Sequence, residues 1–272
     1  MNRAERKVKA EETIKIIEQG FYFDTNNNRI ELKDVVGKSI DNTIHYTSGE
    51  LEKLANELVF DNEFKTDFQV TNEDSISAIL RMRIDDNVMC LNFASAKNPG
   101  GGFLNGSLAQ EESLALSSGL HESQMSVFEF YEMHRRMKSC IYTDHMIYSP
   151  NVPVFRNHKT ELLSEYKLCS FITSPAVNFG VVNRNEKNKV ESVPQIMSKR
   201  MEKLLSLSYA KGHQTLILGA WGCGVFQNEP NDIAKLFKEH FDNKFKNRFK
   251  KVVFAIYSKN EKFLSAFKNE FQ

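Results

Sequence analysis

Hydrophobic residues along this chain gather in two patterns that alternate. Short apolar runs, which are typical of strands buried on both faces of a sheet, occur at 68–70, 88–93, 145–148, 168–173, 215–218 and 252–257. Between them, apolar residues recur at helical spacing over 74–83, 110–118, 123–139, 194–210 and 230–241. This alternation predicts an α/β domain, in which a mostly parallel or mixed sheet is covered by helices on both faces.

The first 60 residues have a different pattern. Apolar residues at helical spacing over 3–19 end at Gly20, and two short apolar runs flank the turn-forming stretch 24–28. This predicts a helix followed by a β-hairpin. The segment is too apolar to stay disordered. We therefore expect 1–60 to be an accessory extension packed on a main domain of 61–272, the two forming one structural unit.

Composition limits the kinds of ligand that the chain can hold. Its 36 basic and 35 acidic residues leave a net charge of +1, which argues against binding a polyanion by bulk electrostatic attraction. An anionic ligand must therefore be held by local hydrogen-bond donors. The histidines and cysteines show no metal-binding spacing, so we expect neither a metal nor a cofactor.

The same sequence gives expectations about location. No apolar leader opens the chain and no apolar stretch is long enough to span a bilayer, so neither secretion nor a membrane association is indicated. Four widely spaced cysteines predict buried free thiols in a reducing compartment. We expect a cytoplasmic protein, and a monomer.

A glycine-rich turn follows the apolar run 88–93. It reads Asn98-Pro99-Gly100-Gly101-Gly102, and after seven further residues Gln110, Glu111 and Glu112 open a predicted helix. Consecutive glycines accept positive φ and allow a ligand to approach bare backbone N–H groups. Neighbouring residues on a helix point about 100° apart, so we expect the two glutamates not to share one direction and to have different tasks. Asn92, in the preceding strand, is expected to be satisfied by backbone.

A second glycine loop follows the apolar run 215–218, and its sequence is Gly219-Ala-Trp-Gly222-Cys-Gly224-Val-Phe226. Neither loop has the glycine order of a Walker phosphate loop or of a dinucleotide-binding turn. Each could be no more than a tight turn, and acids in a first helical turn are common. Together, however, two glycine loops at neighbouring strand ends could hold a diphosphate through backbone amides alone.

These two motifs resemble those of microbial-type poly(ADP-ribose) glycohydrolases, which are catalytic relatives of macrodomains. The shared signature is a glycine triplet, a short spacer and Gln-Glu-Glu, and the resemblance extends over nearly the whole chain. It implies a macrodomain-like mixed sheet between helices. It also implies hydrolysis of the ribose–ribose bonds of poly(ADP-ribose), with release of ADP-ribose.

The resemblance assigns roles to individual residues. Glu112 is the implied catalytic acid and base, and Glu111 the residue that holds hydroxyls of the distal ribose. Phe226 is the candidate to pack against that ribose. The residues implied in substrate binding are Asn98, Gly100, Gly101, Gly102, Gln110, Gly222, Cys223, Gly224, Val225 and Phe226.

The chemistry agrees with such a pair. Cleavage of a glycosidic bond needs a proton for the leaving oxygen while an oxocarbenium-like centre develops, and partial burial can keep a glutamate protonated near neutral pH. Two alternatives stay open: a mono-ADP-ribosyl or O-acetyl-ADP-ribose hydrolase on the same scaffold, and a non-catalytic ADP-ribose reader. Two glutamates disfavour the reader, because recognition alone does not need a carboxylate at the scissile bond.

Overall fold

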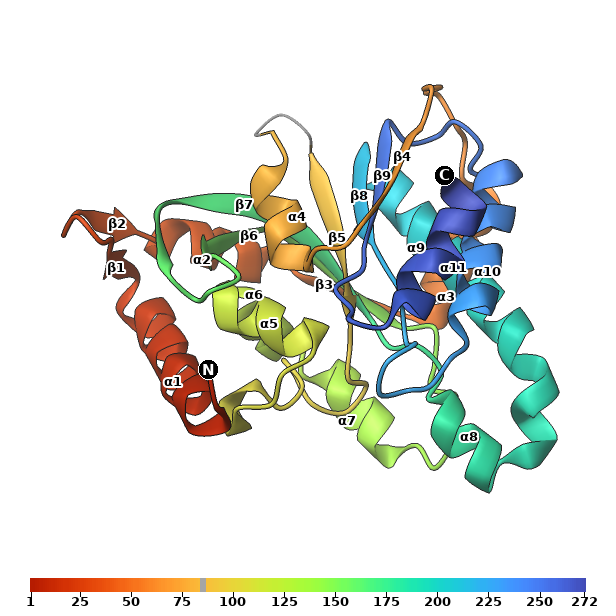
Figure 1. The fold of residues 1–272 in the computed structure, drawn as a ribbon, viewed down its shortest axis with the longest axis horizontal. Coiled ribbons are helices and arrows are strands. Elements are labelled where there is room, and N and C mark those ends of the chain that lie inside the picture. The colour runs from red at the N-terminus through yellow and green to blue at the C-terminus, as the bar shows by residue number, and fades with distance from the viewer. Residues whose placement is uncertain (84–86) are drawn as a thin grey trace.

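The computed structural model describes residues 1–83 and 87–272, which are built around a seven-stranded mixed sheet (Figure 1). The strand order is β3-β6-β7-β5-β8-β9-β4. Strands β7, β5, β8, β9 and β4 run parallel, whereas β6 and β3 are antiparallel to their neighbours. The strands are β3 (Ile44–Tyr46), β4 (Asp67–Thr71), β5 (Val88–Phe93), β6 (Met146–Arg156), β7 (Leu162–Ser174), β8 (Thr215–Leu218) and β9 (Lys251–Ala255).

Helices cover both faces of this sheet, as the sequence predicts. In β5, Met89 and Leu91 face one core and Cys90 faces the other, because successive side chains of a strand point to opposite faces. The first core is closed by α3 (Ser48–Glu57), α9 (Val193–Ala210), α10 (Pro230–Asp242) and α11 (Glu261–Phe271). The second is closed by α4 (Ser75–Arg81), α5 (Gln110–Ser117) and α6 (Leu120–Met125).

The N-terminal segment forms the predicted helix and hairpin. Helix α1 (Arg3–Gln19) ends at Gly20, whose φ of 78° is the left-handed conformation that glycine accepts without strain. Strands β1 (Phe21–Phe23) and β2 (Arg29–Glu31) pair antiparallel, and α2 (Lys33–Asp41) follows. Strand β3 then pairs with β6, so the first 60 residues contribute a strand to the central sheet. The division at residue 60 stays a prediction.

Several elements differ from the pattern-based prediction. The 123–139 segment forms two helices, α6 and α7 (Glu129–Arg136), because the chain turns at Ser126–Phe128. Strands β6 and β7 extend well beyond their apolar cores as an antiparallel hairpin with two register shifts. In these polar extensions, backbone hydrogen bonds between β6 and β7 maintain the strand conformation. Elements that the apolar pattern does not predict are α2, β3, α3, α8 (Phe179–Asn185) and α11.

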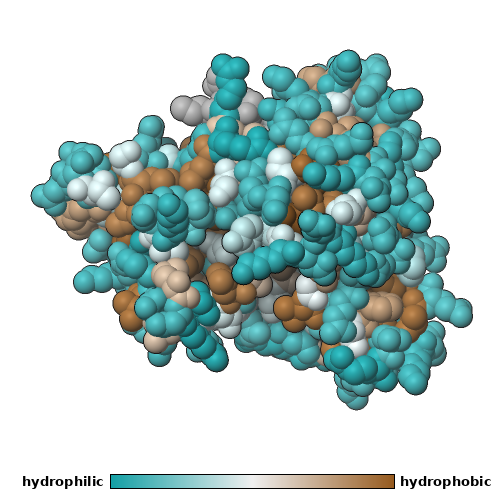
Figure 2. Space-filling view, in the orientation of Figure 1, coloured by the Kyte–Doolittle hydropathy of each residue, from teal (hydrophilic) through white to brown (hydrophobic). Residues whose placement is uncertain are grey.

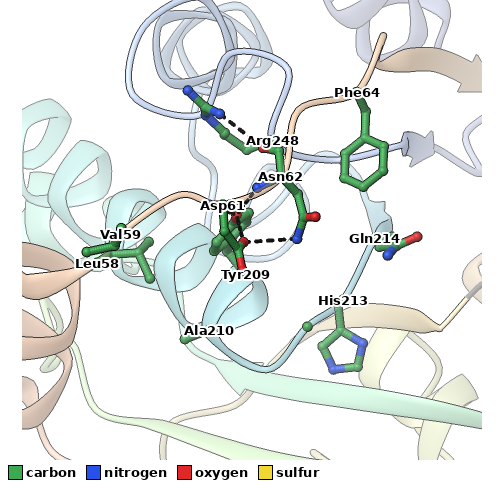
Figure 3. A pocket seen from close by; sticks show the side chains of 11 residues that line it. Leu58, Val59, Asp61, Asn62, Phe64, Tyr209, Ala210, His213, Gln214 and Arg248 are labelled. Carbon is green, nitrogen blue, oxygen red and sulfur yellow. Dashed lines mark hydrogen bonds between the residues drawn. The ribbon is translucent and has the colours of Figure 1, made fainter.

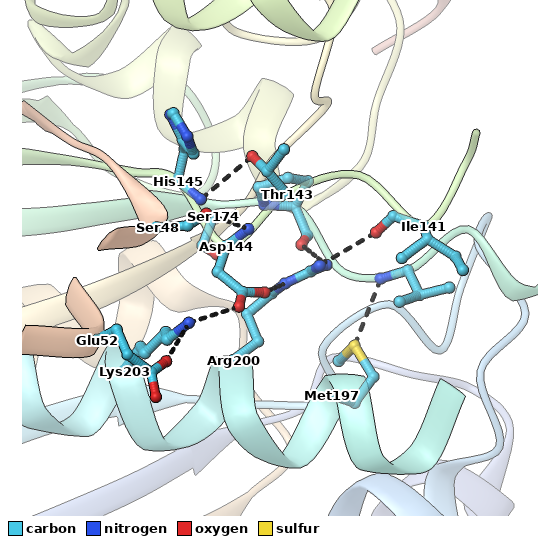
Figure 4. A network of polar contacts seen from close by, with 12 residues as sticks. Ser48, Glu52, Ile141, Thr143, Asp144, His145, Ser174, Met197, Arg200 and Lys203 are labelled. Atoms are coloured by element: carbon cyan, nitrogen blue, oxygen red, sulfur yellow. Dashed lines mark hydrogen bonds and ion pairs between the residues drawn. The ribbon is translucent and has the colours of Figure 1, made fainter. Parts of the chain in front are cut away.

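A buried polar network joins α9 to the two loops that flank β6 and β7 (Figure 4). The fully buried Arg200 donates to Asp144 Oδ1 at 2.9 Å, to the Pro175 carbonyl at 2.8 Å and to the Ile141 carbonyl at 3.1 Å. Lys203 donates to the other Asp144 oxygen at 2.8 Å. Burial would raise the pKa of Asp144, but the charges of Arg200 and Lys203 outweigh it and hold that pKa below its usual value.

Arg200→Met should lower the free energy of unfolding by about 3 kcal/mol, because two buried carbonyls lose their donor and Asp144 loses one of its partners. Urea unfolding followed by circular dichroism measures the change. Lys199→Met, at an exposed neighbouring position of α9, is the matched control. Equal midpoints for both variants would show that the network contributes no stability.

Candidate active site

Both glycine loops leave the sheet at the same edge. Strands β5 and β8 are adjacent and parallel, so the segment after Phe93 and the loop after Leu218 start side by side. Figure 2 shows a hollow near the middle of this face, with apolar side chains on both sides, in the area where Figure 1 draws these segments. The strand ends thus meet as the sequence predicts.

Glu111, at the start of α5, is buried at 3% exposure and accepts hydrogen bonds on both carboxyl oxygens. Asn92 of β5 donates to Oε1 at 3.1 Å, and so does Gln124 of α6 at 3.3 Å. The Ser95 amide donates to Oε2 at 2.6 Å. Burial raises the pKa of Glu111 to about 8, with a further contribution from the charge of Glu112, although these donors act in the opposite direction.

The contacts of Asn92 differ from the expectation that backbone satisfies it. Its amide nitrogen bonds Glu111 and, at 3.1 Å, the hydroxyl of Thr173 on β7. The side chain points to the α5 face of the sheet, where the buried carboxyl supplies the acceptor. The signal that could have found this contact is an amide within an otherwise apolar strand, since a buried polar group needs a partner.

Glu112 lies beside Glu111 but is only partly buried. Its Oε1 accepts from the Gly102 amide at 2.9 Å. A Cβ at Gly101 would stand 2.5 Å from Glu112 Oε1 and 3.1 Å from Glu111 Oε2. Both carboxyl groups therefore approach the same glycine. The expectation that they do not share a direction is wrong, because the flexible side chains bring the carboxyl groups together although their Cα–Cβ bonds point apart. Their surroundings nevertheless differ, one buried and one accessible.

The amides of the glycine triplet are engaged within the protein. Gly100 donates to the Gln124 side chain at 2.9 Å, Gly101 to the Asn98 carbonyl at 3.0 Å and Gly102 to Glu112. The expectation of bare N–H groups in this loop is therefore wrong. Positive φ at Gly100 and Gly101, and the missing Cβ at Gly101, instead make room for the carboxyl groups. Direct substrate contacts by this loop, including exposed Asn98, stay a prediction.

Gln110 fastens the start of α5 to β5. Its side-chain oxygen accepts from the Phe93 amide at 2.9 Å, and its nitrogen donates to the Leu91 carbonyl at 2.8 Å and to the Ser75 hydroxyl at 3.0 Å. These bonds place the two glutamates at the end of the strand. The substrate contact implied for Gln110 stays a prediction.

Two buried side chains fix the position of the loop after β8. Trp221 is fully buried, and its indole nitrogen donates to the Ser174 carbonyl at 3.1 Å. Asn228 donates to the Val177 carbonyl at 2.8 Å and to the Gly222 carbonyl at 3.1 Å. Trp221 ties the loop to the last residue of β7 and Asn228 ties it to the segment after that strand, and the apolar pattern gave neither side chain a role.

Several backbone amides of this loop have no hydrogen-bond acceptor within residues 1–83 and 87–272. They include the N–H groups of Gly222, Gly224, Val225 and Phe226. The Cys223 amide, in contrast, donates to the Ala220 carbonyl at 3.1 Å, and its thiol is buried. Consecutive free amides are the feature that an anion-binding loop requires.

Phe226 ends this loop beside a residue that the sequence did not single out. The ring of Tyr142 lies 6.2 Å from that of Phe226, centroid to centroid. Tyr142 has a φ of 60°, which is rare for a bulky residue and is typical of functional regions. The Arg200 network holds its neighbour Ile141, so the backbone around Tyr142 is fixed by α9.

Other possible sites lie elsewhere or are absent from the part of the chain that is described. A cavity of about 290 Å³ is lined by residues that include His213, Gln214 and Arg248 (Figure 3), and one of about 560 Å³ by residues that include Asn87 and Val88. Both lie where β8 and β5 begin, at the edge opposite the glutamates. The described residues contain no group of three or more His, Cys, Asp or Glu that could hold a metal ion, and no helix able to cross a membrane.

Comparisons with known proteins identify the family of the chain. The sequence profile described as microbial-type PARG, catalytic domain, where PARG is poly(ADP-ribose) glycohydrolase, matches residues 10–157. No curated protein matches the chain. The Thermomonospora curvata PARG bound to the inhibitor ADP-HPD is 38% identical with a TM-score of 0.92, covering 98% of this chain and 100% of that one.

A glutamate-to-alanine mutant of the same Thermomonospora curvata enzyme gives the same identity of 38% and TM-score of 0.92. The Deinococcus radiodurans PARG in complex with ADP-ribose is 36% identical with a TM-score of 0.84, covering 89% of this chain and 99% of that one. The chain therefore belongs to the microbial-type poly(ADP-ribose) glycohydrolases, a family of glycosidases with a macrodomain-like fold.

Proposed function

We propose that this chain hydrolyses the ribose–ribose bond of poly(ADP-ribose) and releases ADP-ribose, with Glu112 as the acid and then the base. The observation that carries the proposal is the convergence of two carboxyl groups, one buried and one accessible, on Gly101. The end of β5, beside which these carboxyl groups lie, is next to the end of β8, where the loop with the free amides begins. The ADP-ribose and ADP-HPD complexes of the relatives support this class of substrate.

Glu112 has the position that the chemistry needs. It is the more accessible carboxyl of the pair, and the Gly102 amide fixes one of its oxygens, leaving the other for substrate. A proton passes from Glu112 to the leaving ribose oxygen as the glycosidic bond breaks and positive charge develops on the distal ribose. The resulting carboxylate then takes a proton from the attacking water.

Glu111 supports this step from a buried position. With its pKa raised to about 8, its carboxyl is mostly neutral at pH 7. A neutral carboxyl can hydrogen-bond a hydroxyl of the distal ribose without burying an anion. Hydrogen bonds from Asn92, Gln124 and the Ser95 amide fix the Glu111 carboxyl, so that it can orient the distal ribose.

The diphosphate is assigned to the loop after β8. The amides of Gly222, Gly224, Val225 and Phe226 need acceptors, and phosphate oxygens supply them without a lysine or a metal. Phe226 then lies between the diphosphate and the distal ribose. This assignment explains how a chain with a net charge of +1 could bind a dianionic unit.

The alternatives differ in what they require of the glutamates. A reader needs only the loop after β8, and a mono-ADP-ribosyl hydrolase would use the same carboxyl pair on a different leaving group. We further propose that the protein acts as a monomer in the cytoplasm. Its four cysteines are free thiols, which is typical of a reducing compartment.

Glu112→Gln should lower turnover of poly(ADP-ribose) at least about 10²-fold, because the amide keeps the Gly102 contact but cannot donate the proton. Release of ADP-ribose from the polymer measures turnover, and calorimetric titration with ADP-ribose should show binding retained. Glu57→Gln, at an exposed glutamate of α3, is the control. Near-normal turnover by the Glu112→Gln variant would show that Glu112 is not the acid. If the unaltered protein turned over mono-ADP-ribosylated peptides and not the polymer, the mono-ADP-ribosyl hydrolase would be favoured.

Gly224→Val should weaken ADP-ribose binding about tenfold or more without lowering the melting temperature. A Cβ at Gly224 meets no protein atom within 4 Å, so any obstruction falls on the ligand. Gly222 is less suitable, because its Cβ would stand 2.5 Å from that of Ala176. Calorimetry measures the affinity, with Gly49→Ala, an equally open glycine of α3, as control. Equal affinity of Gly224→Val and the unaltered protein would refute the cradle.

Glu111 should make the folded protein less stable as pH rises. Because folding raises its pKa from 4.5 to about 8, the folded state holds a proton that the unfolded state releases in this range. The stabilisation is complete below the unfolded pKa and is lost as pH rises through the folded one. Urea unfolding from about pH 5 to pH 8 should show a steeper loss for the unaltered protein than for Glu111→Gln. Parallel curves would contradict the raised pKa.

A further inference from the structure

The first turns of α1 contact the segment that joins the glycine triplet to α5. Arg3 donates through Nε to the Asn105 carbonyl at 2.9 Å, and Arg6 donates through Nε to the Gly106 carbonyl at 2.8 Å. Figure 1 shows α1 beside this segment. Two guanidinium groups therefore hold two successive carbonyls of one turn, the 3₁₀ turn Phe103–Asn105 and the Gly106 that follows it.

The contact continues as an apolar interface. Phe103 of the turn packs in one cluster with Ala10 of α1 and with Ala115 and Leu116 of α5. The buried Thr13 hydroxyl donates to the Leu116 carbonyl at 2.7 Å. Helix α1 thus contacts both the turn and the helix that carries the glutamates, and it restrains them relative to each other.

The turn connects directly to the proposed acid. The amides of Asn105 and Ser107 both donate to the Gly102 carbonyl, at 3.0 and 3.1 Å. The amide nitrogen of Gly102 donates to Glu112 Oε1 at 2.9 Å. A shift of the turn therefore moves the donor that fixes the Glu112 carboxyl.

The fit between α1 and the turn leaves no space. Gly106 has a φ of +70°, and a Cβ at this position would run into the backbone carbonyl of Arg3. Any side chain here would push α1 and the turn apart. A substitution at Gly106 would therefore displace the turn, just as loss of the Arg3 and Arg6 side chains would.

We propose that Arg3 and Arg6 are positioning residues for the hydrolysis, which hold the turn 103–106 and so orient Glu112 through the Gly102 amide. Both precede the region that the family profile matches, which begins at residue 10. The proposal rests on the proposed function. It makes α1 the support of the carboxyl pair, whereas the diphosphate loop is held separately by Trp221 and Asn228.

Because the carboxyl pair and the diphosphate loop are held by different residues, turnover and ADP-ribose affinity should respond differently to loss of the arginines. In the full-length protein, the double variant Arg3→Ala/Arg6→Ala should turn over poly(ADP-ribose) about tenfold more slowly, since small displacements of a reacting group are costly. Its dissociation constant for ADP-ribose should stay within about twofold, because the free amides are untouched. Lys7→Ala, an exposed cation of the same helix, should leave both quantities unchanged.

Two further variants separate positioning from general stability. Arg3→Lys/Arg6→Lys should recover much of the turnover, because an ammonium can also donate to a carbonyl. Gly106→Ala should reproduce the loss from the other side of the interface, again with ADP-ribose affinity kept. Full turnover in both the double alanine variant and Gly106→Ala would overturn the proposal, and so would equal losses of turnover and ADP-ribose affinity. Polymer hydrolysis by the unaltered protein is measured alongside, and its absence would instead refute the proposed function.

Discussion

The arrangement of this site depends on the burial of one carboxyl group. Glu111 lies between β5 and α6, and each of its hydrogen bonds comes from a different part of the chain: a strand, the segment after it and a helix. A buried acid needs such partners, because an unpaired polar group in the interior is costly. By holding these parts together, Glu111 also determines where its neighbour Glu112 emerges.

The two glycine loops have different physical purposes, although their sequences look alike. The first uses glycine to make space, so that both carboxyl groups can approach Gly101. The second uses glycine to leave amides without protein acceptors. Under the proposed function, the first loop serves the bond to be broken and the second the charge to be bound, so that a nearly neutral chain would recognise an anionic substrate without a basic surface.

The parts of the structure that were predicted from sequence are those with a strong local signal. Strands β5 and β8 lie where continuous apolar runs end in glycine loops, and α5 begins at Gln110 as expected. The contacts of Asn92 and Gln124 with Glu111 could not be read in this way, because they join residues of different elements and depend on the packing of α6 against the sheet. The same holds for Tyr142, whose φ of 60° no local pattern indicates and whose neighbour Ile141 is bonded by Arg200 of α9.

The burial of Trp221 has a practical consequence for studying the molecule. It is the single tryptophan of the chain, and it anchors the loop that presents the free amides. The indole is at 0% exposure, so its emission reports on the packing between that loop and the core. The protein thus carries an intrinsic fluorophore at the loop proposed to hold the diphosphate, and emission spectroscopy can test ligand association there without an attached dye.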